Sequence, residues 1–178
     1  MYKSKHFLKK VFFDQIMKKE INNLSNKTTK LKKSITFFYT DHIEKSSWKN
    51  LYNEAIKRNY KTKFTNNLNY KAEIGFYCHD QAINNNAKLS FIFLHGIDQN
   101  RNLWPNPWEI VNWNFYDYAI LPGQNWADMW AKASYEPFSR PKKGVYKLGW
   151  SKADNLLSRN FKAKRKVILK KINSKKKT

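Results

Sequence analysis

Positive charge is concentrated at the two ends of this chain, and this restricts what the chain can fold into. Residues 140–178 contain 15 Lys and Arg and one acid, Asp154. Residues 1–77 contain 17 basic and six acidic side chains, whereas residues 78–139 contain three basic and six acidic ones. So much like charge opposes a compact state unless a polyanion neutralises it. We therefore expect basic extensions on both sides of a less charged centre.

Nucleic acid is the commonest polyanionic partner of such a chain, because each phosphate that a cation neutralises releases condensed counterions. The alternative is a solvated basic surface that only keeps the protein soluble. A net charge of +22 exceeds the modest charge that solubility requires. The charge therefore favours nucleic-acid binding.

Length and composition limit the fold class. A chain of 178 residues allows one domain with extensions, and 41% apolar residues suffice for one modest core. Cys78 is the only cysteine, which excludes an intrachain disulfide and a cysteine zinc site. No apolar run reaches the 18 residues of a membrane-spanning helix. We expect an α+β fold: a small irregular domain with basic helical N- and C-terminal extensions.

The chain divides into three segments. We predict a basic N-terminal helix and arm in residues 1–46, an α+β, aromatic-rich middle region in residues 47–139, and a basic RNA-binding loop with a C-terminal helix in residues 140–178. Apolar periodicity predicts helices at 3–20, 47–59, 127–132 and 151–171, and strands at 70–79 and 89–94. Residues 22–36 read as a polar linker, residues 140–149 as a loop, and the proline-punctuated residues 101–138 as an irregular path.

No residue pattern predicts catalysis. Cys78, His79 and Asp80 are consecutive, so in a strand they point to opposite faces and cannot form a relay. His95 precedes Gly96, but no nucleophile elbow accompanies it. A Gly-rich phosphate loop and a paired-histidine metal motif are also missing from the sequence. We expect a protein that is not an enzyme, with no catalytic residues, no metal ligands and no cofactor.

Tryptophan is concentrated in the middle of the chain. Five of the seven tryptophans lie between residues 101 and 138, namely Trp104, Trp108, Trp113, Trp126 and Trp130. Such side chains stack on unpaired bases, fill a core or contact a neighbouring protein. Base stacking usually comes with interleaved cations, which this segment lacks. We therefore favour protein contact or core for these residues.

One segment resembles a ribosomal protein family. Residues 140–152 read Arg-Pro-Lys-Lys-Gly-Val-Tyr-Lys-Leu-Gly-Trp-Ser-Lys, and Leu121-Pro122 lies about twenty residues upstream. This pattern is similar to the C-terminal signature of the fourteenth small-subunit ribosomal protein family, with one insertion before Gly144 and one deletion after Tyr146. The Arg-rich segment that the family has between these points is replaced here by acidic and aromatic residues. The resemblance implies contacts to small-subunit rRNA from Arg140, Lys142, Lys143, Lys147 and Lys152.

The C-terminal helix adds further candidate RNA contacts. Cations lie among apolar residues there, at Arg159, Lys162, Lys164, Arg165 and Lys166. Side chains of this kind contact phosphates, which gives affinity and position but does not read sequence.

Amino-acid usage suggests an organelle. The chain has 30 Lys against five Arg, and Asn, Ile, Phe and Tyr are abundant; all have AT-rich codons. The seven Trp fit an AT-rich gene if TGA encodes Trp, as in many mitochondrial codes. We expect a mitochondrially encoded structural constituent of the mitochondrial ribosome, in the matrix and in the small subunit. Its expected partners are rRNA and neighbouring ribosomal proteins, without homo-oligomers.

Two alternatives remain open. One is a lineage-specific accessory subunit of a mitochondrial respiratory complex or ATP synthase, whose basic patches hold cardiolipin. The other is a small hydrolase or nuclease, for which the sequence offers no identifiable site.

Overall fold

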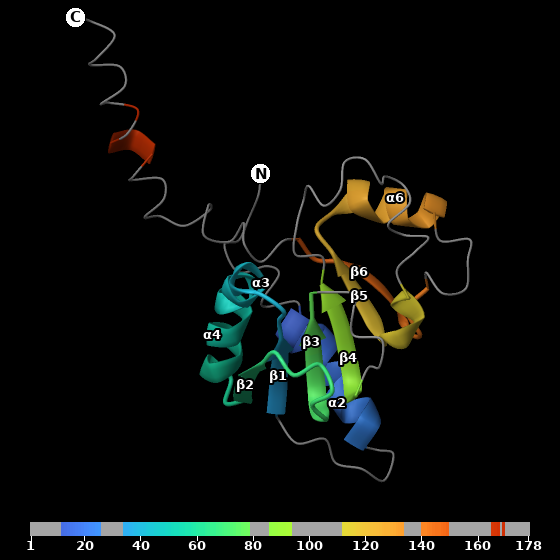
Figure 1. The fold of residues 1–178 in the computed structure, drawn as a ribbon. Coiled ribbons are helices and arrows are strands. Elements are labelled where there is room, and N and C mark those ends of the chain that lie inside the picture. Colours follow the sequence, from blue (N-terminus) through green and yellow to red (C-terminus); the bar gives the residue numbers. More distant parts are fainter. Residues whose placement is uncertain are drawn as a thin grey trace, which may run out of the picture.

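In the computed structural model, which describes residues 12–25, 34–78, 86–93, 112–133, 140–149, 165–167 and 169, six parallel strands form one sheet (Figure 1). The strands are β1 (Ser34–Phe38), β2 (Lys61–Thr65), β3 (Ala72–Tyr77), β4 (Ala87–Phe93), β5 (Tyr118–Leu121) and β6 (Gly144–Lys147). Their order is β2-β1-β3-β4-β5-β6, and every neighbouring pair is parallel. The predicted mixture of helices and strands is confirmed, and the parallel sheet is a feature that the sequence did not predict.

Helical segments connect and cover the strands. They are η1 (Phe12–Met17), α2 (Lys18–Ser25), α3 (His42–Ser47), α4 (Lys49–Lys57), η3 (Trp113–Phe115) and α6 (Gln124–Ala133). The start of α3 is capped by side chains: Asp41 accepts a hydrogen bond from the backbone N–H of Glu44, and Glu44 accepts one from the N–H of Thr40, the residue before the N-cap. The chain leaves α4 at Asn59, whose φ of 61° is a left-handed conformation that Asn tolerates.

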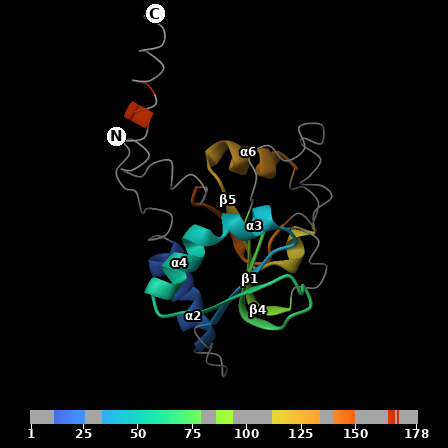
Figure 2. The same cartoon turned by 60° about the vertical axis from the view of Figure 1, so that its left-hand side comes forward.

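One face of the sheet is covered by helices and is dry. Alternate strand residues point toward it, and Phe37, Phe76 and Phe91 there are completely buried. The ring of Phe12 in η1 lies 5.1 Å from that of Phe91 and 5.4 Å from that of Phe76. Leu51 of α4 packs into the same cluster. Figure 2 shows α2 and α4 on this same side of the strands.

The other face differs between its two ends. At the carboxyl ends of the strands it is apolar: Phe38 and Tyr77 stack with ring centroids 4.3 Å apart, and η3 and α6 add tryptophans to this second cluster. At the amino ends the strand residues on this face are polar or charged, and they include Ser34, Thr36 and Lys88. The connection over residues 66–71 crosses this face on its way from β2 to β3, and its Leu68 and Tyr70 pack on the apolar cluster.

Most predicted elements of the middle region are present. The strands predicted at 70–79 and 89–94 are β3 and β4, and the helix predicted at 127–132 lies within α6. The helix predicted at 47–59 is α4, preceded by α3. These elements carry strong local periodicity, which explains why the sequence reveals them.

Four short strands were missed. β1 lies mostly within the predicted linker, β2 follows the helix predicted at 47–59, β5 lies within the predicted irregular path, and β6 within the predicted loop over residues 140–149. Each has four or five residues, and each is held by pairing with a strand that is distant in the sequence. Such pairing is a tertiary effect that local propensity does not report.

The N-terminal segment contributes to the core. The apolar side chains of η1, and Ile35 and Phe37 of β1, are buried in one cluster with residues of α4, β3 and β4, whereas Phe38 of β1 belongs to the cluster on the other face. The predicted C-terminal helix over 151–171 lies mostly outside the described residues, and residues 165–167 and 169 of it are helical. Within the described ranges, no helix combines the length and apolar character needed to cross a membrane.

Candidate nucleic-acid interface

The loop that leads into β6 presents part of the predicted RNA-binding signature. Its backbone is anchored on the two residues that precede β5: Lys142 N donates to Tyr116 O at 2.9 Å and Lys143 N donates to Asp117 O at 2.8 Å. Arg140 and Lys142 are exposed. The anchored backbone therefore places these two cations at one edge of the sheet, where a phosphate backbone has access to them.

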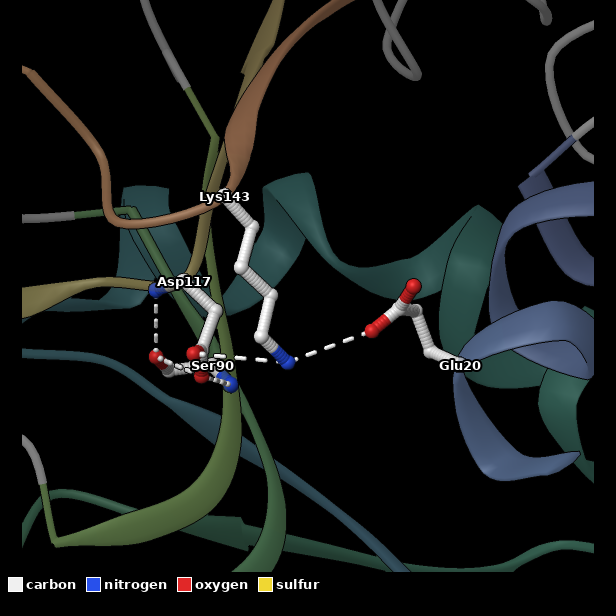
Figure 3. A network of polar contacts seen from close by, with 4 residues as sticks. All are labelled: Glu20, Ser90, Asp117 and Lys143. Carbon is white, nitrogen blue, oxygen red and sulfur yellow. Dashed lines mark hydrogen bonds and ion pairs between the residues drawn. The ribbon is translucent and has the colours of Figure 1, made fainter. Parts of the chain in front are cut away.

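Lys143 takes a different position from its neighbours. Its Nζ lies 3.2 Å from Glu20 Oε2 and 3.6 Å from Asp117 Oδ1 (Figure 3). The Lys143 side chain is 35% exposed, whereas that of Glu20 is 7% exposed. This predicted RNA contact thus joins α2 to the β5 and β6 edge within the fold.

The network in Figure 3 extends to β4 through Asp117. Ser90 donates to Asp117 Oδ2 from its backbone N at 2.9 Å and from its Oγ at 3.0 Å, and Asp117 N donates to Ser90 Oγ at 2.9 Å. Ser90 is completely buried, and its hydroxyl already donates and accepts. These hydrogen bonds therefore cross-link β4 to the residue that directly precedes β5.

The phenol of Tyr118 lies beside the same network. Burial, and then the nearby Glu20 carboxylate, raise the pKa of Tyr118 above its ordinary value. The Tyr118 ring stacks on Phe91, with centroids 5.4 Å apart and an interplanar angle of 17°. Tyr118 therefore stays neutral and packs as part of the core.

Lys147 lies at the carboxyl end of β6. Its Nζ is 2.6 Å from Gln124 Oε1, at the beginning of α6, and the side chain is exposed. Arg165 and Lys166 are exposed on the described part of the C-terminal helix. The remaining predicted RNA contacts lie outside the described residues: Lys152, Arg159, Lys162 and Lys164.

Three of the five tryptophans predicted to contact a protein or the core lie within the described residues, and they differ in burial. Trp113 is 2% exposed and belongs to the apolar cluster of the second face. Trp126 and Trp130 lie one turn apart on α6, are half-buried, and pack against that cluster. Their partial exposure leaves aromatic surface on α6 for a neighbour. Trp104 and Trp108 lie outside the described residues.

The carboxylates of the described residues all have partners within the fold. Asp14 and Glu54 pair with Arg58, Glu73 pairs with Lys88, and Glu20 and Asp117 pair with Lys143. Asp41 and Glu44 cap α3, and Asp128 accepts from Gln124. Exposed cations are more numerous: Lys18, Lys19, Lys45, Lys49, Lys57, Lys61, Lys63, Lys71, Lys88, Arg140, Lys142, Lys143, Lys147, Arg165 and Lys166. The described carboxylates thus interact with groups of the same fold, whereas most of the described lysines are exposed to solvent.

The place where open parallel sheets commonly bind small ligands is closed here. Strand order reverses between β1 and β3, and ligands usually bind outside the carboxyl ends of strands at such a point. The described residues at that point, which include Tyr39, Leu68 and Cys78, leave no space for a water-sized sphere. Within the described part of the chain, no three His, Cys, Asp or Glu residues come together as metal ligands.

Comparison with known proteins gives no match: no family model, no curated protein and no solved structure shows significant similarity to the chain.

Proposed function

We propose that this protein is a structural constituent of the mitochondrial ribosome, in its small subunit, and that it binds rRNA through its basic terminal segments. The observation that carries the proposal is the division of charge: the described carboxylates are engaged within the fold, while fifteen described cations are exposed, of which Lys88 and Lys143 form ion pairs with the described acids. A phosphate backbone neutralises such a surface and gains free energy from counterion release. No reaction is proposed.

Several features support the finer parts of the proposal. Arg140, Lys142 and Lys147 are exposed along the β6 edge, where they can contact phosphates. The partly exposed Trp126 and Trp130 on α6 suit contact with a neighbouring ribosomal protein. The mitochondrial location rests on the amino-acid usage, and the small subunit on the resemblance of residues 121–152 to a small-subunit family.

Sedimentation tests this proposal. The tagged chain, expressed in mitochondria, is expected to migrate with small-subunit rRNA in a sucrose gradient and to leave it at high salt, since phosphate contacts are salt-dependent. Migration with detergent-solubilised inner-membrane complexes, unchanged by ribonuclease, would instead indicate the accessory-subunit alternative and overturn the proposal.

Crosslinking tests which residues make the contacts. Ultraviolet crosslinks to rRNA are expected in peptides from residues 140–178, with fewer in the Lys142→Ala/Lys147→Ala double variant. Lys49→Ala/Lys57→Ala removes two exposed lysines of α4 and is the matched control. Crosslinks found only between residues 78 and 139 would contradict the assigned roles.

A further inference from the structure

A groove opens on the polar part of the second face, at the amino ends of the strands. Its volume is about 780 Å³, and its lining comes from the starts of β1 to β4 and from the crossing segment. The lining residues are Ser34, Thr36, Asn59, Lys61, Tyr70, Lys71, Ala72, Glu73, Asn86, Ala87 and Lys88. Among the described residues no helix covers this part of the face, whereas η1, α2 and α4 cover the opposite one. The groove is therefore open to a partner.

The lining of the groove is predominantly cationic. Lys61, Lys71 and Lys88 contribute three positive charges against the one carboxylate of Glu73. Lys63 follows on the edge strand β2, two residues beyond Lys61. Lys61, Lys63 and Lys71 are exposed. A partner that fits this charge is an anion, and the spread of the lysines across several strands suits an extended one.

Tyr70 places an aromatic ring among these cations. The Nζ of Lys63 lies 3.8 Å from the centre of the Tyr70 ring, and Tyr70 is only partly buried. Aromatic rings beside basic side chains are the usual platform for unpaired bases, because every base presents a π-face. Other cations also lie over aromatic rings, such as Lys45 over Tyr39, but the pair that includes Tyr70 borders the groove.

Glu73 adds a hydrogen-bond acceptor that the fold does not use fully. Its Oε1 is 2.8 Å from Lys88 Nζ, which fixes the carboxylate in place. Its Oε2 is buried and has no hydrogen-bond partner among the described residues. A buried carboxylate oxygen is costly without a donor. Exocyclic amino groups of bases are donors of this kind, and carboxylates accept from the amino group of cytosine.

We propose that this groove binds an unpaired stretch of RNA, with phosphates on Lys61 and Lys71, a base on Tyr70, and a base amino group on Glu73. The inference rests on the proposed function, since it names a second rRNA contact of the same protein. It places this contact on the folded sheet, away from the C-terminal tail. It also predicts a preference for single strands and for amino-bearing bases, which a purely electrostatic surface does not have.

Binding of short RNAs to the full-length protein tests the groove. Fluorescence anisotropy is measured with labelled cytidine and uridine octanucleotides at several salt concentrations. Lys61→Ala/Lys71→Ala is expected to weaken binding of both octanucleotides about tenfold and to reduce the magnitude of the salt slope by about 1.4, as expected when two phosphate contacts to a single strand are lost. Tyr70→Leu is expected to weaken binding about tenfold with the salt slope unchanged, because stacking is lost but charge is not.

The Glu73→Met substitution distinguishes recognition of a base from electrostatic attraction to phosphates. The substitution adds one net positive charge to the groove, so affinity for the uridine octamer is expected to rise. The preference for cytidine over uridine, about fivefold in the unsubstituted protein, is expected to disappear with the lost acceptor. Equal affinity of the unsubstituted protein for the two octamers would refute the role of Glu73.

The matched control is Lys49→Ala/Lys57→Ala on α4, which removes the same charge from the other side of the sheet. If the control and the groove variant lose affinity equally, the groove is not a site and only net charge acts. If an RNA duplex binds as tightly as the single strands, the inference also fails. Either result would leave co-sedimentation with the ribosome unchanged, so it would refute the groove and not the proposed function. If the protein bound short RNAs through the groove but did not sediment with the ribosome, only the proposed function would be refuted.

Discussion

The two faces of the sheet differ in how they are covered: one packs against helices, and the other has an open groove at the amino ends of the strands. On the covered face, residues such as Phe37, Phe76 and Phe91 are completely buried beneath helices. On the other face, the amino ends of the same strands carry Ser34, Lys61 and Lys88 beside an open groove. A strand alternates its side chains between faces, so each strand serves both surfaces at once. Stability is therefore concentrated on one face, which leaves half of the other free for a partner.

Phe76→Ala, on the covered face, is expected to cause the largest loss of stability among the substitutions that compare the two faces. Phe76 is completely buried, and its ring lies 5.0 Å from Phe37 and 5.6 Å from Phe91. Truncation removes buried apolar surface and leaves a cavity, so the free energy of unfolding should fall by about 3–5 kcal/mol. Chemical denaturation measures the change. Lys61→Ala on the open face should change it by less than about 0.5 kcal/mol, and equal losses would remove the distinction between the faces.

A second, smaller effect tests how the apolar end of the open face is packed. A Cβ at Gly75 would lie 2.5 Å from Tyr77 Cε2 and 2.8 Å from Ala87 Cβ, so the ring of Tyr77 requires glycine there. Gly75→Ala should cost about 1–3 kcal/mol through overpacking. Gly123→Ala meets nothing within 4 Å and is the control, with a cost of no more than about 1 kcal/mol at the start of α6. A tolerated Gly75→Ala would show that Tyr77 moves freely.

The third prediction concerns the ion pairs that join the covering helix α2 to the sheet edge. Lys143→Met leaves the buried Glu20 carboxylate without its cation, at an expected cost of about 1–2 kcal/mol; partial exposure of Lys143 keeps the value below that of a fully buried pair. Lys142→Met, on the exposed neighbour, is the control and should cost less than about 0.5 kcal/mol. Thermal unfolding measures both, and a cost from Lys142→Met equal to that from Lys143→Met would contradict the structural role of Lys143.

The smallest effect is a pH dependence from the two buried phenols. Burial raises the pKa of Tyr77 and of Tyr118 above the ordinary value of 10. The folded state then keeps protons that the unfolded state loses, so the contribution to stability is complete below pH 10 and is lost as the pH rises beyond it. Each phenol should reduce the unfolding free energy by roughly 1 kcal/mol per pH unit above pH 10.

Tyr77→Phe isolates one of these contributions. The hydroxyl of Tyr77 is buried and has no hydrogen-bond partner in the described part of the chain, so its removal should be nearly neutral at pH 7. Above pH 10 the variant should lose stability more slowly than the unsubstituted protein. Parallel pH profiles for the two proteins would show that Tyr77 does not contribute.

The sequence indicated the elements that carry their own periodicity. The apolar runs at residues 70–79 and 89–94 are strands, and the pattern around residues 127–132 is helical. β6 was not predictable in this way, because Gly144 to Lys147 is a strand only through its pairing with β5. The candidate groove was equally hidden, since Lys61, Lys71 and Lys88 are separated in the sequence and meet only across neighbouring strands. Alternation along each strand was the one signal that could have grouped them.

The sequence alone determines the net charge and its uneven distribution along the chain, and this charge is enough to predict a polyanionic partner. The tertiary structure decided which charges remain available. Lys142 and Lys143 are adjacent in the sequence and both have exposed surface, yet Lys143 is held by ion pairs with Glu20 and Asp117. The physical reason is that an ion pair depends on distance in space and on burial, and parallel pairing of distant strands sets both.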